Sequence, residues 1–212
     1  SSDVLGLLIE AVSGRGLADH LHETLFRPLG MADTAFAIAP GQAQRLAQLY
    51  ACDSVDGSPL LVPDQTFDPC LAPRMASGGA GLISTAGDYG RFANRLLAGD
   101  SPLLHPDLLR PMLSDQLGPL GVHADPSPGE SALLSPGYGF GLGCFAVRLP
   151  GDAANLPGHA GSYLWSGTAG TLFWVDPQLQ LVAVYMSQAP GASRQHYRRW
   201  IMQLVYAALP RP

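Results

Sequence analysis

The sequence predicts an α+β fold, in which a mainly helical region is followed by an antiparallel sheet that a C-terminal helix covers. In the first half of the chain, apolar residues recur at helical spacing. In the last third, short runs rich in aromatic and β-branched residues alternate with Gly and Pro, as in sheets with tight turns. With 47% hydrophobic and 14% charged residues, the chain can form a core. We therefore expect a helical region with long loops at 1–135 and the sheet with its helix at 136–212.

Five helices are predicted in the first region, at residues 4–12, 17–29, 42–49, 89–97 and 105–113. The first carries apolar residues on most of its faces, so we expect it to be buried. Gly30 ends the second helix, and Pro106 favours the start of the last. Thr85 or Ser84 is a suitable N-cap for the fourth helix, and Asp88 is placed to complete a capping box.

Between these helices, residues 51–76 contain four prolines and are predicted to form a long ordered loop. Residues 118–135 show the weakest sequence pattern of secondary structure, so we expect them to be the least structured part of the chain.

Four extended segments follow, at residues 138–148, 162–168, 171–175 and 181–187. A turn at Asp176-Pro177-Gln178 predicts that the last two pair as a hairpin. The closing helix spans 193–209, and we expect its apolar stripe to lie on the sheet. This stripe comprises Tyr197, Trp200, Ile201, Leu204, Val205 and Ala208.

Charge and composition exclude several classes of function. The net charge is −5, and the only basic cluster is Arg194, Arg198 and Arg199, so we expect no nucleic-acid partner. No apolar run is long enough to span a membrane. The three cysteines, Cys52, Cys70 and Cys144, form no metal-ligand spacing and signal no disulfide framework. We expect neither a metal nor a cofactor.

All 12 basic residues are arginines, so the chain contains no lysine. Schiff-base chemistry, a phosphate-binding P-loop lysine and a Ser-x-x-Lys nucleophile are therefore excluded within these residues.

The most distinctive segment is 158–177, where Gly, Ser and Thr recur within predicted strands. Glycine in a strand often marks the close approach of a ligand or of another backbone, and a tight crossing of strands explains it equally. His159 stands just before one of these strands. It could face a cleft, although a structural role is the more common one for such a histidine.

Four stretches resemble the serine β-lactamase-like hydrolases, which include class C β-lactamases, penicillin-binding proteins and family VIII esterases. The first two are Asp3-Val4-Leu5-Gly6 with Glu10-Ala11-Val12-Ser13-Gly14, and Leu25-Phe26-Arg27-Pro28-Leu29-Gly30-Met31-Ala32-Asp33-Thr34. The others are Ser77-Gly78-Gly79-Ala80-Gly81-Leu82-Ile83-Ser84-Thr85-Ala86-Gly87-Asp88, and Trp165-Ser166-Gly167 through Phe173-Trp174-Val175-Asp176-Pro177. The resemblance covers nearly the whole chain and corresponds to the back portion of the family's fold.

The resemblance implies a third active-site element at Trp165-Ser166-Gly167, with the backbone N–H of Thr168 as an oxyanion donor. Trp in place of the lysine of β-lactamases favours an esterase. The family's Ser-x-x-Lys and its catalytic tyrosine motif are absent, so we expect no catalytic nucleophile in this chain. A front segment that carries them is expected before residue 1.

We therefore expect the C-terminal part of a serine hydrolase that acts on a small-molecule ester or amide through an acyl-enzyme. One alternative is a non-catalytic binding or interaction module derived from that fold, and another is a D-amino-acid peptidase or β-lactamase. The missing segment or a second copy of the chain is the expected protein partner, because it would cover exposed apolar faces. The compartment is open between bacterial cytoplasm and periplasm, and we favour the cytoplasm.

Overall fold

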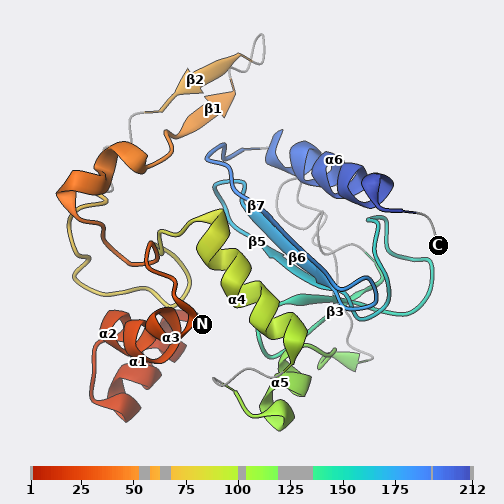
Figure 1. The fold of residues 1–212 in the computed structure, drawn as a ribbon, viewed down its shortest axis with the longest axis horizontal. Helices are drawn as coiled ribbons and strands as arrows, with labels where there is room; N and C mark the ends of the chain where they lie inside the picture. Colours follow the sequence, from red (N-terminus) through yellow and green to blue (C-terminus); the bar gives the residue numbers. More distant parts are fainter. Residues whose placement is uncertain are drawn as a thin grey trace. The chain divides into compact units, whose positions relative to one another are not determined.

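The structure is a computed structural model that describes residues 2–52, 58–62, 68–99, 104–118, 136–191 and 193–210 (Figure 1). Packing divides the chain into two compact units, which we describe separately. One comprises Ser1–Ala47 and Pro63–Phe92, and the other Gln48–Val62 and Ala93–Pro212. The expected α+β class, with an antiparallel sheet and a C-terminal helix, is confirmed. The expected division at 135 follows secondary-structure content, whereas packing groups residues 93–118 with the sheet.

The first unit is helical. Its elements are α1 (Ser2–Ser13), α2 (Leu17–Leu21), the π-helix η1 (His22–Phe26), α3 (Arg27–Leu29), the 3-10 helix η2 (Pro40–Arg45) and the start of α4 (Ala86–Ala98). The second predicted helix is confirmed as the continuous run from α2 to α3, although its middle turn is a π-helix. Gly30 ends it with a left-handed φ of +67°. The helix predicted at 42–49 forms instead as the shorter η2, which begins at Pro40.

Helix α1 has the predicted extent, but the expectation that it is buried is wrong for this chain. Val4, Leu5 and Leu8 are more than half exposed, and Val12 is 81% exposed. The only buried residue of the helix is Gly6. Within the described part of the chain, α1 therefore packs through its smallest residue and leaves its larger apolar side chains uncovered.

The start of α1 packs against the glycine-rich loop that begins at Ser77. The hydroxyl of Ser77 donates to a carboxylate oxygen of Asp3 at 2.5 Å and accepts from the N–H groups of Gly79 and Ala80. A Cβ on Gly78 would overlap the backbone carbonyl oxygen of Ser2. Glycine is therefore required at 78 by this close approach of two backbones, and two of the four stretches quoted above meet here.

The third stretch also meets the second one in this unit, at Asp88, whose side chain is buried. One carboxylate oxygen of Asp88 accepts from the N–H of Asp33 at 2.7 Å and from the hydroxyl of Thr34 at 3.0 Å. The other oxygen pairs with Arg91 at 2.6 Å. Thr85 caps α4 by accepting from the Asp88 N–H, as predicted. The Asp88 carboxylate binds the 33–34 turn and Arg91, so the expected capping box is only half formed.

The second unit begins with a hairpin of β1 (Tyr50–Cys52) and β2 (Pro59–Leu61), at a place where the sequence predicts a loop. The Tyr50 N–H donates to the carbonyl of Gln188 at 2.8 Å and so ties the hairpin to the region after the last strand. The loop prediction is wrong for these residues, because Pro59 is the first residue of β2 and a proline there does not interrupt the pairing of a short strand.

The main sheet has five antiparallel strands in sequence order: β3 (Tyr138–Phe140), β4 (Ala146–Arg148), β5 (Tyr163–Ser166), β6 (Leu172–Asp176) and β7 (Leu181–Tyr185). The predicted hairpin of the last two strands is confirmed, with Asp176 opposite Leu181. The segment predicted as one strand at 138–148 forms two strands, because Cys144 adopts a positive φ of 60° in a tight turn.

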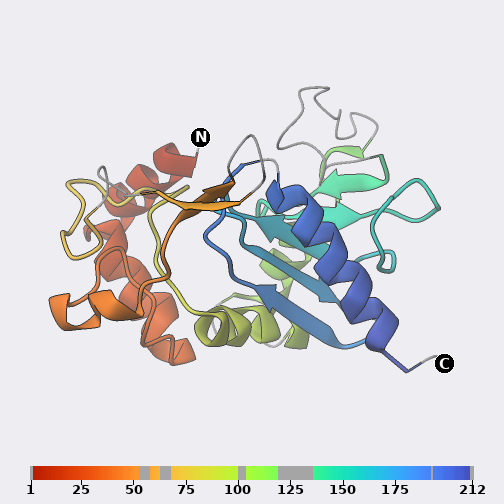
Figure 2. The same cartoon turned by 90° about the horizontal axis from the view of Figure 1, so that it is seen from above.

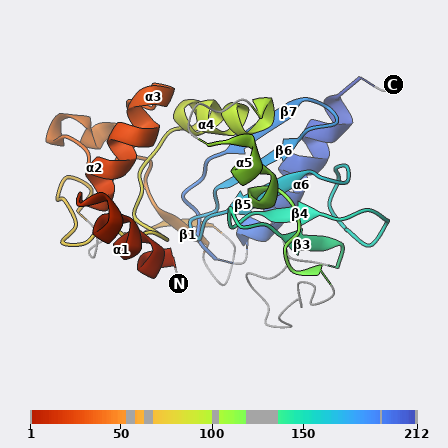
Figure 3. The same ribbon diagram turned by 90° about the horizontal axis from the view of Figure 1, so that it is seen from below.

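Helices cover both faces of this sheet. Helix α6 (Ser193–Ala208) lies over one face in Figure 2, where Met202 packs with Trp174 and Leu164. Helix α5 (Pro106–Met112) lies over the opposite face in Figure 3, and Leu109 from this helix is buried. The alternation of side chains along the strands therefore supplies two cores, one on each face.

Helix α6 has the predicted extent, but only part of the predicted stripe is buried: Ile201 and Val205 pack against the core of the sheet. Tyr197, Trp200 and Leu204 are 45%, 52% and 65% exposed, whereas Arg198 and Met202 are 2% and 1% exposed. The sequence pattern ranks arginines as exposed residues, so it did not place Arg198 on the buried face of the helix.

No helix among the described residues is long and apolar enough to cross a membrane. In the same residues, no group of three or more His, Cys, Asp or Glu side chains could hold a metal ion. The segment predicted to be least structured, 118–135, lies almost wholly outside the described residues.

We predict that Gly78→Ala lowers the free energy of unfolding by about 2 kcal/mol, because the added methyl group forces the loop away from α1. Chemical denaturation monitored by circular dichroism measures this change. Gly41→Ala is the matched control, since a Cβ there meets nothing within 4 Å. Equal stability of the two variants would contradict the packing described here.

Candidate functional site

Four of the five predicted site residues, Trp165, Ser166, Gly167 and Thr168, lie together at one end of the main sheet. Trp165 and Ser166 end β5, and Phe140 ends β3 on the same edge. The Trp165 ring is 39% exposed and packs edge-to-face on Phe140, with ring centroids 5.5 Å apart. A large aromatic side chain is thus held in a fixed orientation beside the loop that follows β5 and is open to solvent.

The loop that follows β5, residues 167–171, is a tight connection to β6. The Gly167 N–H donates to the carbonyl of Thr171, and the Gly170 N–H donates to that of Gly167, each at 3.0 Å. Gly170 has a φ of +108°, and a Cβ there would overlap the hydroxyl of Ser187. The glycines that the sequence pattern singled out are therefore required by the loop itself.

Thr168 is an exposed residue at the tip of this loop. In the part of the chain that the structure describes, its backbone N–H makes no hydrogen bond. Its carbonyl oxygen accepts from the guanidinium of Arg194 at 2.9 Å. An unbonded N–H in an exposed residue, beside a fixed carbonyl, is suited to donate to an oxygen of a bound molecule.

Two buried arginines of α6 contact this loop, and the sequence reasoning missed them. Arg198 donates to the carbonyls of Gly167, Gly170 and Thr171, the last at 3.0 Å. Arg194 is 9% exposed. Their spacing of four residues places both arginines on the same side of the helix, and other residues of this helix also fit a buried stripe. This spacing is the sequence signal that could have found them.

On the other side of Trp165, Asp115 fixes the end of the edge strand β3. Its carboxylate accepts from the N–H groups of Leu117, Gly118 and Phe140 at 3.0–3.1 Å. These backbone donors, that of Leu117 foremost, hold the pKa of the Asp115 carboxyl below its usual range. The ring of Phe140, on which Trp165 packs, is therefore anchored through its own backbone.

His159 lies before β5, at the opposite end of that strand from Thr168. Its Nδ1 is 2.7 Å from a carboxylate oxygen of Asp176, which also accepts from the Tyr206 hydroxyl at 2.8 Å. Burial alone would raise the pKa of the fully buried Asp176, but its hydrogen bonds to His159 and Tyr206 outweigh burial and lower that pKa. The structure thus does not bring His159 together with Trp165, Ser166, Gly167 and Thr168.

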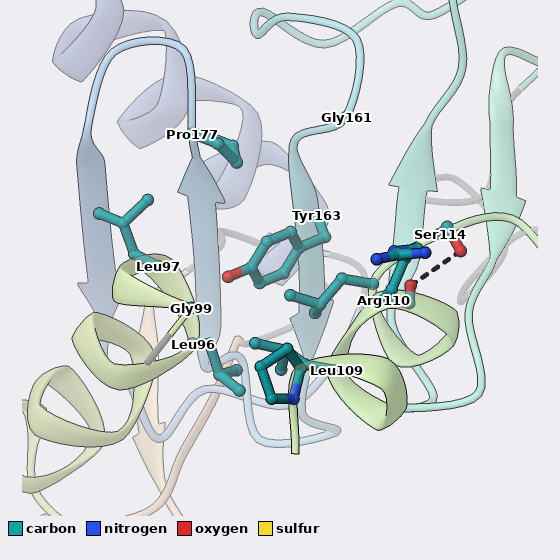
Figure 4. Close-up of a pocket in the computed structure, with 11 residues that line it drawn as sticks. Leu96, Leu97, Gly99, Leu109, Arg110, Ser114, Gly161, Tyr163 and Pro177 are labelled. Atoms are coloured by element: carbon teal, nitrogen blue, oxygen red, sulfur yellow. Dashed lines mark hydrogen bonds between the residues drawn. The ribbon is translucent and has the colours of Figure 1, made fainter. Parts of the chain in front are cut away.

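A cavity of about 440 Å³ lies in the second unit on the α5 face of the sheet (Figure 4). It is lined mainly by apolar side chains of α4, α5 and β5, with Leu96, Leu109 and Tyr163 among them. The Tyr163 hydroxyl is buried and has no hydrogen-bond partner among the described residues, and burial raises its pKa. Because Gly161 and Pro177 also line it, the cavity lies toward the His159 end of the sheet.

Comparison with known proteins identifies the class. The family model described as Beta-lactamase matches residues 1–207, so the chain belongs to the beta-lactamase family. This confirms the resemblance that the four stretches predicted.

Individual relatives include esterases and acyltransferases. Protein Rv1367c of Mycobacterium tuberculosis is 32% identical over 203 residues, and esterase EstB of Burkholderia gladioli is 29% identical over 206 residues. These matches cover 88% and 87% of this chain and 47% of each relative. Among solved structures, simvastatin synthase (LovD) from Aspergillus terreus superimposes with a TM-score of 0.82 at 25% identity, covering 99% of this chain and 55% of that one. The chain therefore spans about half the length of the relatives it matches.

We predict that Asp176→Asn lowers the free energy of unfolding by about 2 kcal/mol at pH 6, because the buried carboxylate loses charge-assisted hydrogen bonds. The pKa of Asp176 is lowered in the folded state from its ordinary value of 3.8. Its contribution is therefore present above about pH 4 and is lost as the pH falls through the folded-state pKa.

Urea denaturation of both proteins between pH 3 and pH 7 measures this difference, which should shrink below pH 4. Asp152→Asn, at an exposed position, is the control. A difference that stays constant down to pH 3 would show that the charge of Asp176 does not contribute.

Proposed function

We propose that this chain forms the oxyanion side of the active site of a serine hydrolase that cleaves small-molecule esters through an acyl-enzyme. The observation that carries the proposal is the N–H of the exposed residue Thr168, which makes no hydrogen bond among the described residues and directly follows the Trp165-Ser166-Gly167 segment on a fixed strand end. A backbone donor held by a sheet needs no reorganisation when negative charge develops on the substrate oxygen.

The presence of tryptophan at position 165 supports an ester rather than a β-lactam as substrate. Trp165 offers an apolar, partly exposed face and no cation. A carboxylate-bearing substrate needs a charged or bidentate donor, whereas an acyl or alcohol group of an ester packs on an aromatic ring. Two matched proteins bear names of this kind: esterase EstB, and monacolin J acid methylbutanoyltransferase of Aspergillus terreus, which is 27% identical.

In this proposal the nucleophilic serine and its lysine belong to polypeptide outside these 212 residues. The chain has no lysine, so Ser-x-x-Lys has to come from elsewhere. The catalytic unit would then be this chain together with a companion polypeptide, either joined to it or separate from it.

Two alternatives remain distinct from this proposal. The absence of lysine favours a non-catalytic binding module if the chain acts alone. A 30% identity over 46% of the chain to the D-alanyl-D-alanine-carboxypeptidase/endopeptidase AmpH of Escherichia coli favours peptides that end in D-alanine. Parallel assays with p-nitrophenyl butyrate, nitrocefin and a D-Ala-D-Ala peptide separate an esterase from a β-lactamase and a peptidase.

We predict that a fluorophosphonate serine probe leaves the mass of this chain unchanged and labels a companion polypeptide that carries Ser-x-x-Lys. Intact-mass spectrometry of the native preparation under denaturing conditions measures both. A probe adduct on this chain would place the nucleophile within the 212 residues. A preparation that contains this chain alone would favour the binding module.

We also predict that an amide-to-ester substitution at Thr168, which removes only the backbone N–H, lowers kcat toward p-nitrophenyl butyrate by about two orders of magnitude. The active preparation, with the companion polypeptide present, is the material to use. The same substitution at Ala169 is the comparison, and an equal or larger loss there would contradict the assignment to Thr168.

A further inference from the structure

Arg198 and Arg194 stand one turn apart on α6, and both are buried against the sheet. Arg198 is 2% exposed and Arg194 is 9% exposed. A guanidinium in such a place is stable only when hydrogen bonds replace its hydration. The carbonyls that provide these bonds therefore show what the two residues hold in place.

Those carbonyls belong to the 167–171 loop. Arg198 donates to the carbonyls of Gly167, Gly170 and Thr171, and Arg194 donates to that of Thr168. The fifth carbonyl, that of Ala169, accepts from the Ala189 N–H at 2.7 Å. Every carbonyl oxygen of the loop is therefore bound.

Because the peptide group is rigid, a contact that fixes its carbonyl also fixes the direction of its N–H group. A trans peptide bond is planar, and its C=O and the next residue's N–H point in opposite directions. Because Arg198 binds the carbonyl of Gly167, the Thr168 N–H in the same peptide plane points away from that guanidinium. A cation at the carbonyl end also polarises the peptide group and strengthens its N–H as a donor.

We infer that Arg198, assisted by Arg194, is a positioning residue for catalysis: it sets the direction and the donor strength of the Thr168 N–H. This inference rests on the proposed function, in which that N–H stabilises the substrate oxyanion. Neither arginine touches the substrate. Lysine cannot fully replace Arg198, because a single ammonium group lacks the planar, forked set of donors with which the guanidinium reaches three carbonyls.

The test compares Arg198→Met, Arg198→Lys and Arg194→Met in the active preparation, with the exposed Arg199→Met as the matched control. We expect Arg198→Met to lower kcat toward p-nitrophenyl butyrate by about 10- to 100-fold, with KM changed less than threefold. Arg198→Lys should recover part of kcat. Arg199→Met should behave as wild type.

Amide hydrogen exchange provides a readout that does not depend on turnover. We expect faster exchange in Arg198→Met at the Gly170 N–H, which is bonded within the loop, and unchanged exchange in β6 and β7. Faster exchange throughout α6 and the sheet would indicate a merely structural role and overturn the inference. If Arg198→Met does not fold, Arg198→Lys and Arg194→Met are judged by the same criteria.

The outcomes separate the two proposals. Turnover that survives both Arg198 substitutions unchanged overturns the inference and leaves the proposed function standing. Absence of turnover in every wild-type preparation that contains a Ser-x-x-Lys polypeptide overturns the proposed function, and with it the catalytic part of the inference.

Discussion

Strand β6 is buried on both of its faces, and most of the second unit can be understood from this constraint. All five of its residues, Leu172 to Asp176, are buried. A strand in this position needs apolar layers above and below it, which α6 and α5 provide. The loop that precedes β6 and the turn that follows it then lie at fixed positions, one at each end of the sheet. The two polar clusters of the unit occur at these two ends.

At each end, polar groups that burial would otherwise destabilise are satisfied by residues far away in the sequence. Asp176 ends β6 and is bound by His159 and Tyr206. At the start of β6, the loop carbonyls are bound by Arg198 and Arg194. Both clusters fix α6 to the sheet, since Tyr206 and the two arginines all belong to that helix. The cluster at the start of β6 lies beside Thr168, an exposed residue whose backbone N–H makes no hydrogen bond among the described residues.

In the first unit, too, polar groups are satisfied by residues far away in the sequence. Its turns and helix starts meet in pairs, at Ser77 with Asp3 and at Asp88 with Thr34. In each pair a short polar side chain satisfies backbone N–H groups of a turn, which secondary structure alone would leave without partners. The large apolar residues of α1 remain uncovered in this chain. A surface of this kind is typical of an interface with further polypeptide.

The sequence by itself determined the fold class, the ends of α1 and α6, the hairpin of β6 with β7, and the family. These features depend on local periodicity, on glycine and proline at turns, and on motifs whose residues are adjacent in the chain. Through the family resemblance it also predicted Trp165-Ser166-Gly167 and Thr168 as a candidate site. Only the tertiary structure decided which face of α6 is buried, where His159 lies, and that Tyr50–Cys52 pairs with Pro59–Leu61. The physical reason is that burial of Arg198 depends on carbonyls 27 to 31 residues away, and no local pattern reports such partners.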